Sequence, residues 1–304
     1  MAGKSLRTTN PYMAEQGRDS TCAVLITCFN RRQKTLDFLA SLTGQDGFAA
    51  LAPDIYLLDD GSTDGTAQAV AEAYPAVKIV QGTGSLFWAG GMRFLWQHVL
   101  TQKNYNLFLL CNDDVVWLDG ALSRLIAAYG LVASKGVVMV GSTLSPGTNK
   151  MSYGGHTLFD VNRAAYHAVV PHEVDSLPFH LGNANILLVD DAAVAKIGVF
   201  TDAYTHYLAD FDYTLTAFKA GLAVLVAPGY YGYCEDDHGV SWLSGKHTLK
   251  QRIKYLYSPK GLAYHEYLFY IKKFFPADYI GAKVKLWMKT LFPVIWDKFK
   301  KTAN

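Results

Sequence analysis

Short apolar runs alternate with helix-like spacings over the first 115 residues, and this alternation restricts the fold more than any other feature. The runs are residues 22–27, 55–58, 77–80 and 106–111. Short, continuous apolar runs are typical of parallel strands that are buried on both faces. Apolar residues after the first run recur at spacings of three and four, and a second helix is expected over 66–74, before Pro75. This order predicts an α/β fold with a mostly parallel, Rossmann-like sheet flanked by helices.

The α/β pattern continues as far as Gly245. Further elements are expected at residues 137–141, 186–189 and 224–227 (strands) and 210–220 (helix). Residues 1–20 are a polar leader, and the character of the sequence changes after Gly245. We therefore expect one globular unit over 21–245 and a distinct C-terminal segment over 246–304.

Composition limits the class of protein. Half of the residues are apolar and 18% are charged, which excludes disorder as the main state. The four cysteines form no C-x-x-C pair and are too few for the disulfide framework of a small secreted domain. No stretch reaches the roughly 18 apolar residues of a membrane span, and the N-terminus lacks the apolar core of a signal peptide. A protein made and kept in the cytoplasm is expected.

Polar clusters follow three of the four expected strands of the first half. They are Asn30-Arg31-Arg32, Asp59-Asp60 and Asp113-Asp114. Parallel α/β sheets bind their ligands at the carboxyl ends of the strands, so these clusters are candidate binding residues. Two carboxylates after an apolar strand suit Mg²⁺ that is shared with the phosphates of a substrate. The alternatives are a helix cap for Asp113-Asp114 and a turn with a cap for Asp59-Asp60.

Two more clusters lie downstream, Asp210-Phe211-Asp212 before a helix and Cys234 to His238. The first could cap its helix, and a single histidine such as His238 is commonly a surface residue. Common nucleotide motifs are absent, because no G-x-x-x-x-G-K-[ST] occurs and no G-x-G-x-x-G follows the first strand. A kinase-like or dinucleotide-dependent enzyme is therefore not expected. No cluster is specific alone, and their order carries the information.

That order resembles the family 2 glycosyltransferases, inverting enzymes with the GT-A fold, over about residues 22–243. The first-half motifs are Thr27-Cys28-Phe29-Asn30-Arg31, Asp59 to Thr66 (DDGSTDGT), Phe87 to Met92 (FWAGGM) and Asn112-Asp113-Asp114. Downstream, the matches are Gly198-Val199-Phe200, Ala209-Asp210-Phe211-Asp212 and His238-Gly239-Val240-Ser241. Departures are Ala209 in place of the usual Glu, Thr216 where Arg is frequent, and Ser85 and Arg93 in place of Asn.

The resemblance implies a role for each cluster. The implied nucleotide-binding residues are Thr27, Phe29, Arg31, Asp60, Asp113, Gly91 and Arg93. The implied ligands of a divalent metal, Mg²⁺ or Mn²⁺, are Asp114 and His238. Asp210 is the implied general base, and Asp212, Trp88 and Asn183 are implied acceptor-side or supporting residues. On this view residues 21–117 form the nucleotide-binding half and 118–245 the acceptor and catalytic half.

The implied activity is inverting transfer of a sugar from a UDP- or dTDP-linked donor to a hydroxyl of a glycan or lipid-linked acceptor. The layout resembles the bacterial rhamnosyl-, galactosyl- and galactofuranosyltransferases that build surface polysaccharides such as O-antigen or capsule. One alternative is a sugar nucleotidyltransferase, although its Gly-rich basic signature is missing near the N-terminus. The other is a catalytically inactive module that binds glycan or membrane, for which Ala209 is the only indication.

The C-terminal segment differs in charge from the rest of the chain. Residues 1–245 contain 15 Lys and Arg against 23 Asp and Glu, whereas residues 246–304 contain 13 against 3. The net charges are therefore −8 and +10, and the segment also holds 13 of the 41 aromatic residues. This asymmetry predicts a separate role for the segment.

Within this segment, apolar residues recur at helical spacings with lysines between them. They are Val284, Met288, Leu291, Ile295 and Phe299, accompanied by Trp287 and Trp296. A basic amphipathic surface of this kind binds anionic bilayers, which predicts a peripheral protein on the cytoplasmic face of the inner membrane. The alternative is a helix packed on the body, and Pro293 argues against one straight helix. No motif supports a nucleic-acid partner.

Overall fold

The computed structural model describes residues 21–236 and 242–299. A nine-stranded sheet has the strand order β3-β2-β1-β4-β11-β6-β12-β5, and β9 also pairs with β12. Its strands are β1 (Cys22–Cys28), β2 (Asp54–Asp59), β3 (Lys78–Gln81), β4 (Leu107–Asn112), β5 (Val116–Trp117), β6 (Val137–Leu144), β9 (Leu177–Pro178), β11 (Ile186–Asp190) and β12 (Ala223–Tyr233). β11 runs antiparallel to both β4 and β6, whereas the β3-β2-β1-β4 half is parallel throughout. The predicted mostly parallel α/β sheet is confirmed.

The central strand β1 explains why its sequence is a continuous apolar run. Val24 and Ile26 belong to the apolar cluster on one face of the sheet, and Ala23 and Leu25 belong to the cluster on the other face. Successive side chains of a strand point to opposite faces, so burial on both faces requires apolar residues at every position. Burial of this kind fixes the strand at the centre of the sheet.

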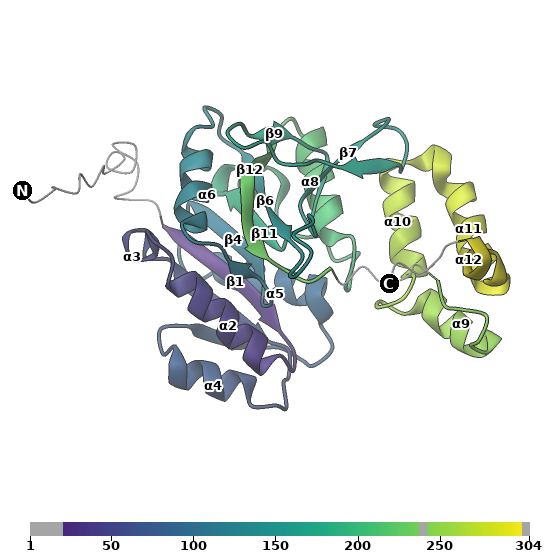
Figure 1. Cartoon of the computed structure of the whole chain (residues 1–304), viewed down its shortest axis with the longest axis horizontal. Coiled ribbons are helices and arrows are strands. Elements are labelled where there is room, and N and C mark those ends of the chain that lie inside the picture. Colours follow the sequence, from purple (N-terminus) through teal and green to yellow (C-terminus); the bar gives the residue numbers. More distant parts are fainter. Residues whose placement is uncertain (1–20, 237–241, 300–304) are drawn as a thin grey trace, which may run out of the picture.

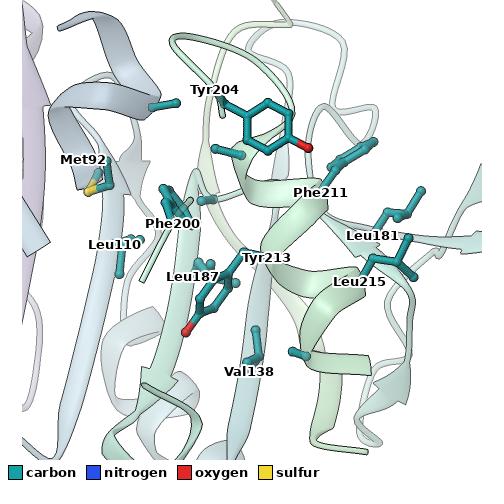
Figure 2. Close-up of a cluster of buried hydrophobic side chains, with 14 of the residues drawn as sticks. Met92, Leu110, Val138, Leu181, Leu187, Phe200, Tyr204, Phe211, Tyr213 and Leu215 are labelled. Carbon is teal, nitrogen blue, oxygen red and sulfur yellow. The ribbon is translucent and has the colours of Figure 1, made fainter. Parts of the chain in front are cut away.

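Helices cover both faces of the sheet (Figure 1). The helices of one face are α2 (Arg32–Thr43), α4 (Thr66–Ala73) and α6 (Ala121–Gly130), with the short α3 (Phe48–Leu51) beside them. Those of the other face are α5 (Phe87–Leu100), α7 (Asp191–Ile197) and α8 (Ala209–Lys219). Figure 2 shows Phe200 and Tyr213 in the cluster between α8 and the sheet. The helices expected over 66–74 and 210–220 are thus present.

The 14-residue helix α5 was not expected from the sequence, because its fourth and fifth residues are Gly90 and Gly91. The structure shows why glycine is present. A Cβ on Gly91 would lie 2.8 Å from Cδ2 of Leu58 and 3.5 Å from Cγ2 of Thr27. The helix therefore approaches β1 and β2 so closely that packing outweighs the low helix propensity of glycine.

A small three-stranded sheet of β10 (Leu181–Gly182), β7 (Gly155–Leu158) and β8 (Tyr166–Ala168) lies beside α8. Beyond it, the helices of residues 249–299 stand together at one end of the molecule (Figure 1). These are α9 (Leu249–Tyr257), α10 (Tyr264–Phe274), α11 (Tyr279–Leu291) and α12 (Val294–Phe299), with a 3₁₀ turn at Pro276–Asp278. Pro293 separates α11 from α12, as the sequence predicted. The expected helical C-terminal extension is confirmed.

The C-terminal helices share an apolar core with the body. Leu268, Ile271, Phe274 and Phe275 belong to the same buried cluster as the residues of α8. Across residues 21–236 and 242–299, no helix is both long and apolar enough to cross a bilayer. The division of the chain near Gly245 stays a prediction.

Candidate active site

A cavity of about 510 Å³ opens where the polar strand ends meet the N-termini of α5 and α8. Its wall includes the following candidate residues from the sequence: Thr27, Phe29, Arg31, Asp60, Trp88, Asp113, Asp114, Asn183 and Asp210. Gly91, Arg93 and Asp212 are not among the described residues that line it. His238 lies outside the described residues. The structure therefore brings most of the separated motifs to one site.

The Asp60 carboxylate organises the loop that leads into α5. It accepts hydrogen bonds from the backbone N–H groups of Gly84 (2.8 Å), Leu86 (2.8 Å) and Phe87 (3.1 Å). A Cβ on Gly82 would lie 2.5 Å from Oδ1 of Asp60, so only glycine fits there. Three donors on one carboxylate fix both the loop and the side chain at the cavity wall. The implied nucleotide-binding role of Asp60 stays a prediction.

The turn interpretation holds for the other two aspartates of this motif. Oδ1 of Asp59 accepts from the backbone N–H of Ser62 at 2.8 Å, and Oδ2 of Asp64 accepts from that of Arg32 at 3.0 Å. Oδ1 of Asn30 accepts from the backbone N–H of Thr63 at 2.7 Å. The first bond closes the turn after β2, and the other two join the loop after β1 to the loop after β2.

Arg31 joins the two carboxylates that follow β4. One guanidinium nitrogen lies 2.9 Å from Oδ1 of Asp113 and 2.8 Å from Oδ2 of Asp114. The Thr35 hydroxyl also donates to Asp113, at 3.2 Å. The helix-cap alternative for this pair is wrong, because the residue that precedes α6 is Gly120 and no side chain caps that helix. The two carboxylates face the cavity instead.

Burial dominates the electrostatics of Asp113. Burial, together with the neighbouring Asp114, raises the pKa of this carboxyl to about 6 against the opposing effect of the Arg31 guanidinium. The two carboxylates in turn raise the pKa of Arg31, which stays cationic. Two adjacent carboxylates that lose their hydration are unfavourable unless a cation compensates their charge. Such a pair at a strand end is therefore typical of a cation-binding site.

The residues present fit a divalent metal that is shared with a substrate. Asp114 offers carboxylate oxygens at the cavity wall, and Asp113 lies directly beside it. Among the described residues, no group of three or more His, Cys, Asp or Glu side chains could hold a metal ion by itself. Mg²⁺ characteristically takes one or two carboxylates and completes its shell with water and substrate phosphates. The donor set therefore suits a metal that binds together with a diphosphate.

Asp210 enters the cavity from the first turn of α8. Its Oδ2 accepts from the backbone N–H of Ala184 at 3.2 Å, and Oδ1 accepts from that of Phe211 at 2.9 Å. Leu208, directly before the helix, has a φ of +70°, a left-handed conformation that is unusual for leucine. Strained backbone of this kind concentrates at functional sites, where it aims a side chain.

Burial also raises the pKa of Asp210 to about 6, although backbone hydrogen bonds and the Asn183 side chain oppose the shift. A carboxylate with this pKa is ionised at neutral pH and is a stronger base than an exposed aspartate. Asn183 contacts this carboxyl group and lines the cavity, so it is placed to orient the acid.

Asp212, two residues further on, is buried and faces away from the cavity lining. Its carboxylate lies 2.7 Å from Nζ of Lys273 on α10 and accepts from the Tyr204 hydroxyl at 2.8 Å. Thr216, where the family frequently has Arg, donates to the same carboxylate at 3.3 Å. The cation that pairs with Asp212 thus comes from the C-terminal segment. The pair joins α10 to the helix that carries Asp210.

Trp88 and Arg93 both contribute from α5. The indole N–H of Trp88 donates to Oδ1 of Asn112 at 2.8 Å, so it fixes the end of β4 at the cavity. Arg93 donates to the carbonyl oxygens of Thr201 and Tyr204, at 3.2 and 3.3 Å. It therefore positions the loop before α8 and does not reach the cavity wall. Gly91 and Arg93 are not among the described residues of the cavity wall, and their implied nucleotide-binding roles stay predictions.

Sequence reasoning missed several residues of the wall. They are Tyr153, Tyr166, Asn185, His206, Tyr207 and Lys260. His206 and Tyr207 lie shortly before Asp210, so their closeness to that motif was an available signal. Tyr166 comes from the small sheet and Lys260 from the C-terminal segment, and nothing in the local sequence of either connects it to the site.

The chain is similar to known proteins in part of its sequence and in its fold. Residues 23–163 match the family model for glycosyl transferase family 2. No curated protein sequence is significantly similar to the chain. The chain is similar in structure to residues 1–349 of TarS from S. aureus in complex with UDP, with a TM-score of 0.53 and 16% identity, covering 71% of this chain and 60% of that chain.

Two further solved structures are similar. One is the mannosyltransferase PcManGT from Pyrobaculum calidifontis in complex with GDP-Man and Mn²⁺, with a TM-score of 0.53 and 16% identity, covering 88% of this chain and 70% of that chain. The other is GalNAc-T7 with UDP, GalNAc and Mn²⁺, with a TM-score of 0.57 and 13% identity, covering 92% and 58%.

At this level of identity the structural likeness shows the fold alone. The chain spans 60% of the TarS structure and 58% of the GalNAc-T7 structure. The sequence match, however, covers the strands and loops that contribute Asp60, Asp113 and Asp114 to the cavity wall. The resemblance found in the sequence is thereby confirmed: the chain is a GT-A protein whose residues 23–163 match the family 2 glycosyltransferases.

Proposed function

We propose that the protein is an inverting glycosyltransferase that moves a sugar from a UDP- or dTDP-linked donor to a hydroxyl of a glycan or lipid-linked acceptor. One observation carries this proposal: Asp60, Asp114 and Asp210, which are separated by up to 150 positions, line a single cavity. Asp60 lies in the loop after β2, Asp114 follows β4, and Asp210 lies in the first turn of α8. These are the positions that the family motifs imply. The volume of about 510 Å³ is within the range of small-ligand sites.

The chemistry divides between two sides of the cavity. Asp210 takes the proton of the acceptor hydroxyl as that oxygen bonds to the anomeric carbon of the donor. The bond from this carbon to the diphosphate oxygen breaks, and its electron pair leaves with the nucleoside diphosphate, which inverts the anomeric centre. Mg²⁺ or Mn²⁺ at Asp114, when bound, would offset the charge that grows on the leaving diphosphate. The Mn²⁺ of the PcManGT and GalNAc-T7 structures supports this cofactor class.

A thermal-shift screen of nucleotides tests this proposal. We expect UDP or dTDP, and their sugar conjugates, to raise the melting temperature in the presence of Mn²⁺, because a ligand that binds only the folded state stabilises it. Adenosine diphosphate serves as the control. If no nucleoside diphosphate shifts the transition with or without metal, the proposed donor class is wrong.

The same reagents separate the two alternatives. A sugar nucleotidyltransferase would form nucleotide sugar from a nucleoside triphosphate and a sugar phosphate. An inactive module would bind the donor without turnover. Slow metal-dependent hydrolysis of the bound nucleotide sugar, with release of the free sugar, supports the transferase and contradicts both alternatives.

We also propose that the outer surface of α11 and α12 binds anionic membranes, which would place the site at the cytoplasmic face of the bacterial inner membrane during surface-polysaccharide assembly. Ile280 and Val284 are 68% and 56% exposed, and Leu291 follows on the same side of α11. Phe292, Val294 and Ile295 extend this apolar surface into α12. Lys283 and Lys285 are exposed next to it, which is the pattern of an interfacial amphipathic helix.

Binding of full-length variants to vesicles tests the membrane proposal. Deletion of the C-terminal segment is avoided, because it would remove the core residues of α10. The double substitution Ile280→Ser with Val284→Ser should abolish co-sedimentation with anionic phospholipid vesicles at low salt. Lys283→Glu with Lys285→Glu should weaken it strongly, since each cation at such a surface contributes about 1 kcal/mol and salt screens the effect. Lys272→Glu, exposed on α10, is the matched control. No binding by the unmodified protein at low salt would contradict the proposal.

A further inference from the structure

One lysine of the C-terminal segment reaches the cavity from outside the region that matches the family. Lys260 lies in the loop between α9 and α10 and lines the cavity wall together with Asp60, Asp114 and Asp210. Its Nζ lies 5.8 Å from the centroid of the Phe87 ring, at the start of α5. The family match ends at residue 163, almost a hundred positions earlier. This contact therefore depends on how the C-terminal helices fold back.

The loop that carries Lys260 is held in one conformation by its own backbone. The N–H of Gly261 donates to the carbonyl of Ser258 at 2.9 Å, and the N–H of Leu262 donates to that of Tyr255 at 3.0 Å. A Cβ on Gly261 would collide with the carbonyl oxygen of Tyr255. Pro259 further restricts the backbone directly before the lysine. The backbone of the loop thus needs little further ordering when a ligand binds at Lys260.

The charge of Lys260 is uncompensated within the described part of the chain. Arg31 and Lys260 are the two permanent cations among the described wall residues. Arg31 is already paired with Asp113 and Asp114, whereas no described carboxylate lies within ion-pair distance of Lys260. An ammonium at the wall of a polar cavity, without a counter-charge among the described residues, is suited to an anionic ligand.

His206 lies on the cavity wall close to Phe87, the same ring that Lys260 approaches. Its ring lies 6.0 Å from the Phe87 ring, and its Nδ1 is buried without a hydrogen-bond partner among the described residues. Burial, then Lys260 and Arg31, lower its pKa to about 4. The imidazole is therefore uncharged at neutral pH and adds no positive charge to that of Lys260.

We propose that Lys260 is a donor-binding residue that contacts the diphosphate of the nucleotide sugar, so that the C-terminal segment completes the active site. This inference rests on the proposed function. The contact would add a cation opposite the growing negative charge of the leaving group, and unlike Arg31 this cation is not already paired with carboxylates of the described chain. An acceptor that carries a phosphate is the other source of the same chemistry, and the assay below distinguishes the two.

The test compares Lys260→Ala and Lys260→Arg with Lys254→Ala, an exposed lysine on α9 that does not line the cavity. Calorimetry first identifies which of UDP, dTDP and GDP binds the unmodified protein with Mn²⁺. We expect Lys260→Ala to weaken that nucleoside diphosphate about tenfold and the corresponding unphosphorylated nucleoside less than about twofold. Lys260→Arg should retain most of the affinity, and Lys254→Ala all of it.

Each other outcome has a defined meaning. Unchanged diphosphate affinity in a folded Lys260→Ala protein overturns the inference but leaves the proposed function standing. An equal loss for the nucleoside overturns it as well, because the effect would not involve phosphate. A rise in acceptor KM without a change in donor KM assigns Lys260 to the acceptor and also contradicts the proposal. If the unmodified protein binds none of the three nucleotides, the proposed function fails and the inference fails with it.

Discussion

The variant Asp210→Asn is expected to lose transfer activity by about 10²- to 10⁴-fold while it keeps its fold and its affinity for the donor. A general base contributes rate enhancement of this size, and an amide cannot take the proton of the acceptor hydroxyl. The fold should survive because an asparagine oxygen can still accept from the backbone N–H of Ala184. Initial rates, measured beside calorimetric binding of the nucleotide, separate the two effects.

Asp212→Asn is the control, because it lies on the same helix but pairs with Lys273 outside the cavity. It should reduce stability, since it removes the charge of a buried ion pair, and reduce the rate much less than Asp210→Asn. An inactive Asp212→Asn beside an active Asp210→Asn would show that the base is assigned two residues too early.

The pH dependence of the reaction should show the raised pKa of Asp210. Because the base acts in its ionised form and its pKa is raised to about 6, activity should be full above this pH and fall as pH decreases through it. Burial raises the pKa of Asp113 to about 6 too, so donor binding must be measured over the same range. The pH dependence of donor affinity shows the protonation of Asp113. The pH dependence of kcat that this does not explain is attributed to Asp210.

Asp114→Ala is expected to abolish the metal dependence of donor binding and to lower activity by about 10²-fold or more. The carboxylate lies at the cavity wall, where it can share a divalent cation with the diphosphate. The fold should be retained, because Arg31 keeps its 2.9 Å contact with Asp113 when Asp114 is removed. The measurement is the affinity for UDP or dTDP with Mn²⁺ and with a chelator.

Asp119→Ala, an exposed acid five positions later, is the matched control and should leave both values unchanged. Donor affinity in a folded Asp114→Ala protein that still rises with Mn²⁺ would contradict the metal role of this residue. His238→Ala in the same assay tests the second implied ligand.

The parallel half of the sheet and its polar strand ends could be read from the sequence for a physical reason. A strand buried on both faces must be apolar at every position, so β1, β2 and β4 stand out as short continuous runs. The chain becomes polar where such a strand leaves the core, and parallel strands leave at the same edge. Local sequence therefore identified Asp60, Asp113 and Asp114, and the gapless spacing of the family motif identified Asp210.

Only the tertiary structure decided which cations meet these acids. Arg31 could have faced a ligand, but it spans Asp113 and Asp114 because β1 and β4 are adjacent in the sheet. Lys273 neutralises Asp212 from 61 positions away, in place of the local Arg that is frequent in the family. Lys260 reaches the cavity from the same segment. A long, flexible lysine carries no periodic signal, so its partner is set by how distant helices pack and not by its neighbours in the sequence.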